Sequence, residues 1–332
     1  MIEQLDTPRS GATRTRTCLI LLLCVVGSVY GCRSSEPSAD AGAAPTEPSQ
    51  SASSSVVETP SAVPALPSAS VEPPAVAQHE GCPDEMILVP ARKPVCVDRW
   101  EAILVDKSTG ERLSPHYPVH RKLALKLEAD WQEKRKTLGS AEAQAMPVPP
   151  LPAWQRDNDA EPVAVSRADQ VPNGYLSGKV AKLACENAGK RLCRRDEWVR
   201  ACRGKRDLQY PYGESYKQGV CNVFRSSHPA GVLHDDPSMG HLDPRLLLVE
   251  DKDGPLLRKT GAVTKCKSAW GDDALYEMVG NLDEWVEDPK GMFVGGFFSR
   301  SKKDGCESVI TAHPNDYFDY SLGVRCCRDP ET

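Results

Sequence analysis

The sequence lacks the features that mark several common functional classes. Its formal net charge is only −5 over 332 residues, which argues against nucleic acid as an electrostatic partner. It contains no glycine-rich phosphate loop, and no two cysteines have the Cys-x-x-Cys spacing of a zinc or redox site. The apolar run at residues 18–29 is too short to span a bilayer comfortably. None of these absences excludes an exported protein, and other features favour one.

Residues 1–31 have the features of a bacterial secretory signal. Arg14 and Arg16 precede the apolar run, and small residues follow it. Residues 29–32 have the sequence VYGC, which resembles a lipobox with Cys32 as the acylated first residue of the mature protein. Ordinary signal cleavage next to an unrelated cysteine is the alternative. We favour the lipoprotein, because a lone cysteine just before a disordered tract has little other use.

Residues 32–80 are rich in serine, alanine and proline and contain no aromatic residue. Such a composition cannot bury enough apolar surface to offset the entropy of ordering, so it predicts a disordered tether. The folded domain is then expected over residues 81–332. A lipid anchor on Cys32 would place it in the cell envelope, attached to a bacterial membrane on the extracytoplasmic side.

Ten cysteines follow the tether, and an even number in an exported chain predicts a disulfide framework. Cys82 and Cys96 flank one strand-like run and could staple it as a hairpin. The neighbours Cys326 and Cys327 should point to opposite sides of a strand and reach different partners. The others are Cys185, Cys193, Cys202, Cys221, Cys266 and Cys306.

Apolar spacing predicts an α+β domain with few long elements. Residues 213–271 show little periodicity and many Gly, Pro, His and Asp residues, which indicates an irregular backbone held by disulfides. The expected strands are residues 86–89 and 95–100, and the expected helices are residues 123–136, 175–189 and 195–203.

The most unusual stretch is residues 274–300, where acids surround a turn at Gly280-Asn281. Carboxylates around a glycine turn are typical of a calcium site, but a solvated acidic turn beside the buried Trp285 is the alternative, and spacing alone favours that alternative. A strand-like aromatic run is expected to begin at Gly295-Gly296. The acids are Glu277, Asp283, Glu284, Glu287 and Asp288.

Ordered motifs over residues 83–327 make the chain resemble a known family. They are CVDRWEA, PVAVS, ACENAGKRLCRRDEWVRACRG, YPYG, CN, EMVGNLDEW, FVGGFF and SLGVRC. Together they are similar to the formylglycine-generating enzyme, or sulfatase-modifying factor, family. The resemblance implies an irregular, loop-rich fold related to C-type lectins and stapled by disulfides.

The resemblance also implies specific cysteine pairs and calcium ligands. The family's structural disulfides correspond to Cys185–Cys326 and Cys202–Cys306; with these given, the remaining pairs are Cys82–Cys96, Cys221–Cys266 and Cys193–Cys327. The family's calcium ligands correspond to Glu277, Gly280, Leu282 and Glu284, and a second site corresponds to Asn222 and Val223. With the resemblance added, calcium outweighs the solvated turn.

The family's chemistry is not expected to transfer. Those enzymes oxidise a substrate cysteine with copper(I) held by two thiolates, which suit a soft ion. Here residues 297–305 contain no cysteine, and Arg300 stands near the first thiolate position. Cys306 is the nearest catalytic candidate, but it is also the expected partner of Cys202. Copper is therefore not expected.

Two functional classes remain. The first is a non-catalytic binding or structural module for a protein or glycan ligand. The second is an enzyme, either a divergent formylglycine-generating oxidase acting on protein cysteines or a different oxidase in the same cleft. A recognition face for an acidic or carbohydrate ligand is expected from Arg300, Lys302, Lys303, Tyr317 and Tyr320.

Acylation of Cys32 can be tested directly. The protein expressed in a bacterium should partition into the detergent phase of a two-phase extraction, because acyl chains bind membranes through buried methylene groups. Cys32→Ala should release the protein or block its maturation. Unchanged partitioning of this variant would rule out the lipid anchor.

Overall fold

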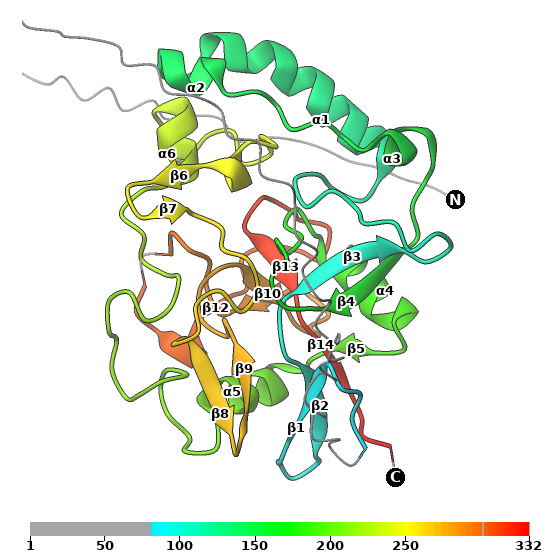
Figure 1. Ribbon diagram of the computed structural model, residues 1–332, viewed down its shortest axis with the longest axis vertical. Coiled ribbons are helices and arrows are strands. Elements are labelled where there is room, and N and C mark those ends of the chain that lie inside the picture. The colour runs from blue at the N-terminus through cyan, green and yellow to red at the C-terminus, as the bar shows by residue number, and fades with distance from the viewer. Residues whose placement is uncertain (1–80, 301, 332) are drawn as a thin grey trace, which may run out of the picture. The chain divides into compact units, whose positions relative to one another are not determined.

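The computed structural model describes residues 81–300 and 302–331 (Figure 1). The predicted signal segment, Cys32 and the tether at residues 32–80 lie outside these residues. Among the described helices, none has the length and apolar character needed to cross a membrane.

The described chain is a mixed α+β structure with short elements and long loops (Figure 1). Its helices are α1 Arg121–Lys134, α2 Ala141–Ala145, α3 Ala153–Asp157, α4 Gly178–Asn187, α5 Arg195–Arg203 and α6 Pro229–His234, with 3₁₀ turns η1 Arg135–Thr137, η2 Leu246–Leu248 and η3 Gly305–Glu307. Its strands are β1 Met86–Val89, β2 Val95–Asp98, β3 Ala102–Asp106, β4 Pro162–Ser166, β5 Arg191–Leu192, β6 Glu250–Asp251, β7 Gly254–Pro255, β8 Lys267–Trp270, β9 Asp273–Tyr276, β10 Asp283–Trp285, β11 Phe293–Val294, β12 Val309–Ile310, β13 Leu322–Val324 and β14 Cys326–Arg328.

Two four-stranded sheets organise these elements. One has the order β1-β2-β14-β5, and its neighbouring strands are all antiparallel. The other has the order β12-β11-β10-β13, in which β10 and β13 run parallel. The chain passes from β13 to β14 across a single residue, Arg325, so it links the two sheets.

The predicted helix at residues 195–203 is confirmed as α5. Its N-terminus is closed by Glu197, whose carboxylate accepts a hydrogen bond from the backbone N–H of Arg194 at 2.8 Å. Trp198, Ala201 and Cys202 form its buried face. The spacing of these residues, three and four apart, is the pattern that identifies a helix packed on one side.

The predicted helix at residues 175–189 begins later than expected, at Gly178. Tyr175 has φ of +57°, a left-handed conformation that cannot start a right-handed helix. Ser177 is the N-cap instead, and its hydroxyl accepts a hydrogen bond from the N–H of Val180 at 3.3 Å. Apolar periodicity alone did not reveal this cap.

The expectation that an aromatic strand begins at Gly295-Gly296 is wrong. The strand is β11, which ends at Val294 just before the glycine pair. Gly295 and Gly296 have φ of +91° and +78°, so the backbone leaves the extended conformation there. The following aromatic residues belong to a loop.

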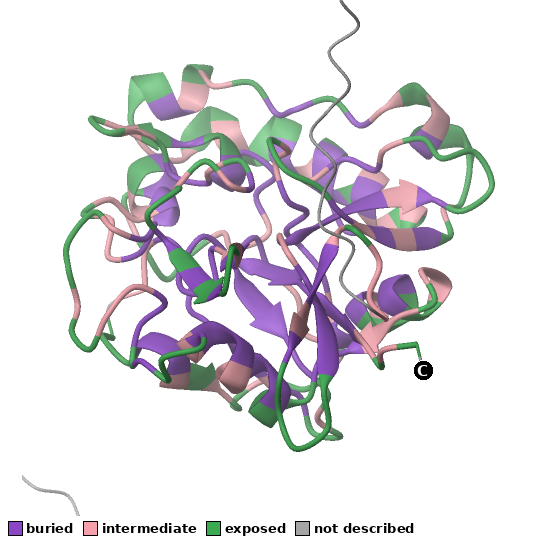
Figure 2. Ribbon diagram, turned by 60° about the horizontal axis from the view of Figure 1, so that its bottom comes forward, coloured by how far each residue is buried: buried purple, intermediate pink, exposed green. Residues whose placement is uncertain are grey.

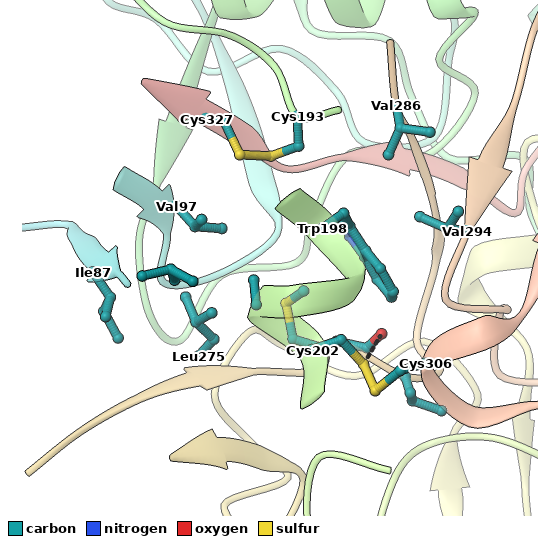
Figure 3. Packing of buried hydrophobic residues seen from close by; sticks show 14 of the residues in the cluster. Ile87, Val97, Cys193, Trp198, Cys202, Leu275, Val286, Val294, Cys306 and Cys327 are labelled. Carbon is teal, nitrogen blue, oxygen red and sulfur yellow. Dashed lines mark hydrogen bonds between the residues drawn. A yellow bond between two sulfur atoms is a disulfide. The ribbon is translucent and has the colours of Figure 1, made fainter. Parts of the chain in front are cut away.

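Buried residues lie along both sheets and on the inner sides of the helices, whereas exposed residues lie at the periphery (Figure 2). The largest cluster surrounds Trp198, which is fully buried. Figure 3 shows this indole packed between the Cys193–Cys327 and Cys202–Cys306 disulfides, with Val286 and Val294 on its other side. Disulfides here form part of the hydrophobic core.

Five disulfides join the ten cysteines of the described chain, in the pairs that were expected. The bonds close sequence separations of 14 to 141 residues, and longer closed loops restrict the unfolded chain more. As expected for neighbours on a strand, Cys326 and Cys327 bond to different partners. Cys326 bonds to Cys185, which precedes β5 in the sequence, and Cys327 bonds to Cys193, which follows it. The pairs are Cys82–Cys96, Cys185–Cys326, Cys193–Cys327, Cys202–Cys306 and Cys221–Cys266.

Candidate functional site

The turn between β9 and β10 carries the acidic motif and is built from left-handed residues. Glu277, Gly280 and Asn281 have φ of +51°, +88° and +64°. A Cβ atom on Gly280 would lie 2.2 Å from the carbonyl oxygen of Asn222, so only glycine allows this close approach. The turn therefore packs directly on the segment that the second predicted calcium site would use.

Asn281 holds the turn in place through its backbone and both ends of its side chain. Its N–H donates to the carbonyl of Asn222 at 2.8 Å. Its Oδ1 accepts from Asn222 Nδ2 and from the backbone N–H of Arg258, both at 2.9 Å. Its Nδ2 donates to the carboxylate of Glu101 and to the carbonyl of Arg258. Because its hydrogen-bonding groups are used in these contacts, Asn281 is a structural residue of the site.

Glu101 is a site residue that sequence reasoning missed. Its carboxylate is fully buried and accepts from the N–H of Leu282 at 2.9 Å. Burial, with the nearby charges of Glu284 and Glu277, raises its pKa well above the usual range. Its only sequence signal was its place in the CVDRWEA motif, directly before a strand, where an unpaired acid would be costly.

The predicted ligand Glu284 is already engaged by protein donors. Its Oε2 accepts from Trp198 Nε1 at 2.6 Å, and both of its oxygens accept from Arg325 at 3.0–3.1 Å. The two side chains are almost completely buried. A calcium ion would therefore share this carboxylate with a guanidinium.

The other predicted carboxylate, Glu277, bridges to a neighbouring loop. It accepts from the N–H groups of Gly261 at 2.9 Å and Val263 at 3.2 Å. Burial raises its pKa to about 7 despite these hydrogen bonds. The turn and the loop at residues 261–263 are thus fastened together by one carboxylate.

The first site offers a calcium ion more acidic groups than the one guanidinium beside them can pair with, although Arg325 already contacts Glu284. Three buried carboxyl groups, Glu101, Glu277 and Glu284, share the single guanidinium of Arg325, and burial raises the pKa values of Glu101 and Glu277. Buried charges need partners, and calcium accepts both carboxylate and carbonyl oxygens. No cluster of three or more His, Cys, Asp or Glu side chains suited to a metal occurs in the described part of the chain. Calcium here would use two carboxylates and backbone carbonyls, as at Gly280.

The residues of the second predicted site do not fit calcium, because a guanidinium contacts Asn222 Oδ1 and pairs with the one nearby carboxylate, Asp251. Arg225 donates to both carboxylate oxygens of Asp251, to the carbonyls of Gly254 at 3.1 Å and Pro255 at 3.3 Å, and to Asn222 Oδ1 at 3.4 Å. Its side chain is only 11% exposed. A dication would be repelled by this fixed charge.

Val223, the other residue of that predicted site, is buried in the core cluster around Trp198. Its N–H donates to the carbonyl of Cys221 at 3.0 Å. The structure therefore places Asn222 and Val223 next to the first site. The positive charge beside them belongs to the side chain of Arg225.

The residues that replace the family's copper thiolates also do not fit a copper ion. Cys306 is bonded to Cys202, and both are fully buried (Figure 3). Arg300 forms an ion pair with the buried carboxylate of Asp283, and its guanidinium lies 5.1 Å from the ring centre of Phe297. A guanidinium has no lone pair to offer a cation.

The expected recognition face is assembled only in part. Lys303 is exposed and lies over the rings of Tyr216 and Phe224, at 4.6 and 5.8 Å from their centres. Tyr317 is half-buried and donates to Asp319 at 2.6 Å. Tyr320 is only 2% exposed, so it belongs to the core and not to a recognition surface.

The fold and this site define the class of the protein: a disulfide-stapled, loop-rich α+β domain built on a GN-x-x-EW turn. Residues 142–330 match the family model described as a sulfatase-modifying factor enzyme 1-like domain. The match covers more than half of the chain, and the chain therefore belongs to this family. Among curated proteins, no significant relative matches.

Solved structures give weaker similarities. The structure titled CarF is 14% identical over 72% of this chain and 87% of its own, with a TM-score of 0.34. PvdO from Pseudomonas aeruginosa is 13% identical over 76% and 100%, with a TM-score of 0.33. The Treponema denticola variable protein 1 is 10% identical over 74% and 98%, with a TM-score of 0.31. Similarities of this size carry no argument about activity.

If the guanidinium of Arg225 takes the place of a calcium ion, removing it should make the stability of the protein depend on calcium. Arg225→Ala should lower the free energy of unfolding by about 1–3 kcal/mol in a chelator, because it removes the guanidinium that pairs with Asp251. Added calcium should restore part of this loss through the freed oxygens. Urea unfolding with and without calcium measures both effects.

Arg206→Ala is the matched control, since Arg206 is an exposed arginine. It should respond to calcium as the wild type does. If Arg225→Ala shows the same calcium increment as the wild type, the assignment is wrong.

Proposed function

We propose that this chain is a non-catalytic binding or structural module of the sulfatase-modifying factor family. It is held in the cell envelope by an acylated Cys32, on the extracytoplasmic side of a bacterial membrane. The observation that carries the proposal is the Cys202–Cys306 disulfide. It removes from copper chemistry the thiol nearest to the family's reactive position.

The availability of thiols decides between the two functional classes. Copper(I) in this family needs two thiolates, and each of the ten cysteines within residues 81–331 is disulfide-bonded. The alternative, a divergent formylglycine-generating oxidase, would need Cys202 and Cys306 in the reduced form. Both are fully buried beside Trp198, so a peptide substrate could not reach them without opening the core.

The ion pair between Arg300 and Asp283 supports the same proposal. Asp283 is buried, and its carboxylate also accepts from the N–H of Gly296 at 3.0 Å. The loop that carries thiolates in the enzymes is here fixed by a charge pair to β10. A loop held in this way serves recognition or rigidity better than metal chemistry.

We further propose that one calcium ion stabilises the module at Glu277, Gly280, Leu282 and Glu284. The three buried carboxyl groups that share one guanidinium support this site, and the pairing of Arg225 with Asp251 argues against a second one. The ion would have a structural role, joining the β9–β10 turn to the loop at residues 261–263 through Glu277.

Copper-dependent catalysis can be tested with the purified chain, copper(I), oxygen and a Cys-x-Pro-x-Arg peptide. Aldehyde capture should give no signal above a heat-inactivated sample, because all ten cysteines within residues 81–331 are in disulfides. Copper-dependent aldehyde formation would overturn the proposal. Cys306→Ser would then show whether the reduced Cys306 thiol is responsible.

Calcium binding can be tested by thermal unfolding. Chelation should lower the melting temperature, since a ligand that binds only the native state stabilises it by about 2.7 kcal/mol at a hundredfold excess over its dissociation constant. Glu277→Gln should lower the melting temperature and remove the effect of the chelator. Glu287→Gln is the control, because Glu287 is an exposed acid paired with Lys182. A wild-type protein indifferent to chelation would exclude the calcium site.

A further inference from the structure

A pocket of about 400 Å³ lies next to the GN turn but outside the predicted site. It opens between η2, the β6–β7 hairpin and the segment at residues 257–262. Its volume falls in the range of small-molecule sites. No role has been assigned above to its lining residues as a group.

The floor of the pocket is apolar and belongs to the core. Leu247 and Leu257 line it, and both belong to a buried core cluster against which Val171 also packs. Leu248 also lines the pocket and is 36% exposed, unusual for a leucine in this domain. The pocket thus presents preformed apolar surface to solvent, which favours an aliphatic or aromatic group.

His116 adds a polar group to one wall. Its Nδ1 is buried and has no hydrogen-bond partner among the described residues. Burial, helped by the nearby charge of Arg112, lowers the pKa of His116 to about 4, so the imidazole is neutral at neutral pH. A buried ring nitrogen without a partner is costly unless a ligand or water bonds to it.

The remaining polar lining carries more positive than negative charge. Arg258 and Lys259 line the pocket, whereas Glu250 is the only acid there. Lys259 forms an exposed ion pair with Asp169 at 3.1 Å. Arg258 forms no ion pair with any carboxylate in the described chain, and its guanidinium donates to the carbonyl of Asp253.

The backbone of Arg258 is also hydrogen-bonded to the turn at Gly280-Asn281. Its backbone N–H donates to Asn281 Oδ1 and its carbonyl accepts from Asn281 Nδ2. The backbone that carries this cation is therefore fixed by the GN turn. A preformed cation beside an apolar floor binds an anion that also has an apolar part.

We propose that this pocket binds the carboxylate of a small apolar acid, with the apolar group on Leu247 and Leu257. The carboxylate would contact Arg258 and Lys259, and a polar atom of the ligand would pair with His116. This inference rests on the proposed function as a binding module, because it names the ligand class of that module. The same chemistry is present in a free N-acylated amino acid and in the C-terminal residue of a peptide.

The test uses the purified full chain and ligand-observed NMR titrations. N-acetyl-leucine should bind, while acetate and N-acetyl-leucinamide should bind at least about tenfold more weakly, because each lacks one half of the recognised group. A tripeptide ending in leucine distinguishes the two sources. Its binding indicates a peptide C-terminus, and binding of N-acetyl-leucine alone indicates a free acid.

Two substitutions should weaken N-acetyl-leucine binding by at least about tenfold. Arg258→Gln removes the cation, and Leu248→Asp places a like charge at the mouth of the pocket. The matched controls are Arg206→Gln and Val309→Asp. Val309 is 36% exposed, as Leu248 is, and neither control residue lines the pocket. Melting temperatures of all four variants show that they remain folded.

The proposal is overturned if the wild type does not bind N-acetyl-leucine, if N-acetyl-leucinamide binds equally well, or if folded Arg258→Gln and Leu248→Asp bind as the wild type does. None of these outcomes bears on the copper assay, whose readout is an aldehyde. The failure of the ligand proposal and the failure of the non-catalytic proposal are therefore distinguishable.

Discussion

The buried guanidinium of Arg325 is the contact on which the arrangement of the domain depends. It binds both oxygens of Glu284, the carbonyl of Asp98 at 2.9 Å and the carbonyl of Tyr276 at 2.7 Å. These partners lie on β10, β2 and β9, which belong to three different sheets. Arg325 itself connects β13 to β14. An arginine suits this position because its planar group offers donors in several directions and stays charged when buried. Loss of Arg325 would leave Glu284 buried without its ion-pair partner.

Much of the framework could be predicted because it depends on local or covalent rules. The helix at residues 195–203 follows from apolar spacing, and the family resemblance supplied the Cys185–Cys326 and Cys202–Cys306 pairs. The errors were also local. Tyr175 and the Gly295-Gly296 pair adopt positive φ, which apolar periodicity does not report.

The site was harder to predict because its chemistry depends on contacts distant in the sequence. Glu101 meets Leu282 across 181 residues, and a lone acid beside a strand gives no sign of such a partner. Arg225 illustrates the same limit. The family resemblance suggested calcium ligands at Asn222 and Val223, but the Asp251 that binds the guanidinium of Arg225 lies 26 residues away in the sequence. Only the folded chain shows that a side chain supplies the positive charge.

Strand β14 has a consequence for the order in which the protein matures. It lies between β2 and β5 in its sheet, and its two cysteines bond to Cys185 and Cys193. Neither β2 nor β5 can pair with β14 until Cys326–Arg328 has been synthesised. During synthesis, the preceding 240 or so residues therefore lack the strand that completes their sheet, and contacts of such long range form slowly. The sheet therefore closes last, and the Cys185–Cys326 and Cys193–Cys327 disulfides lock β14 into it only after the rest of the sheet is in place.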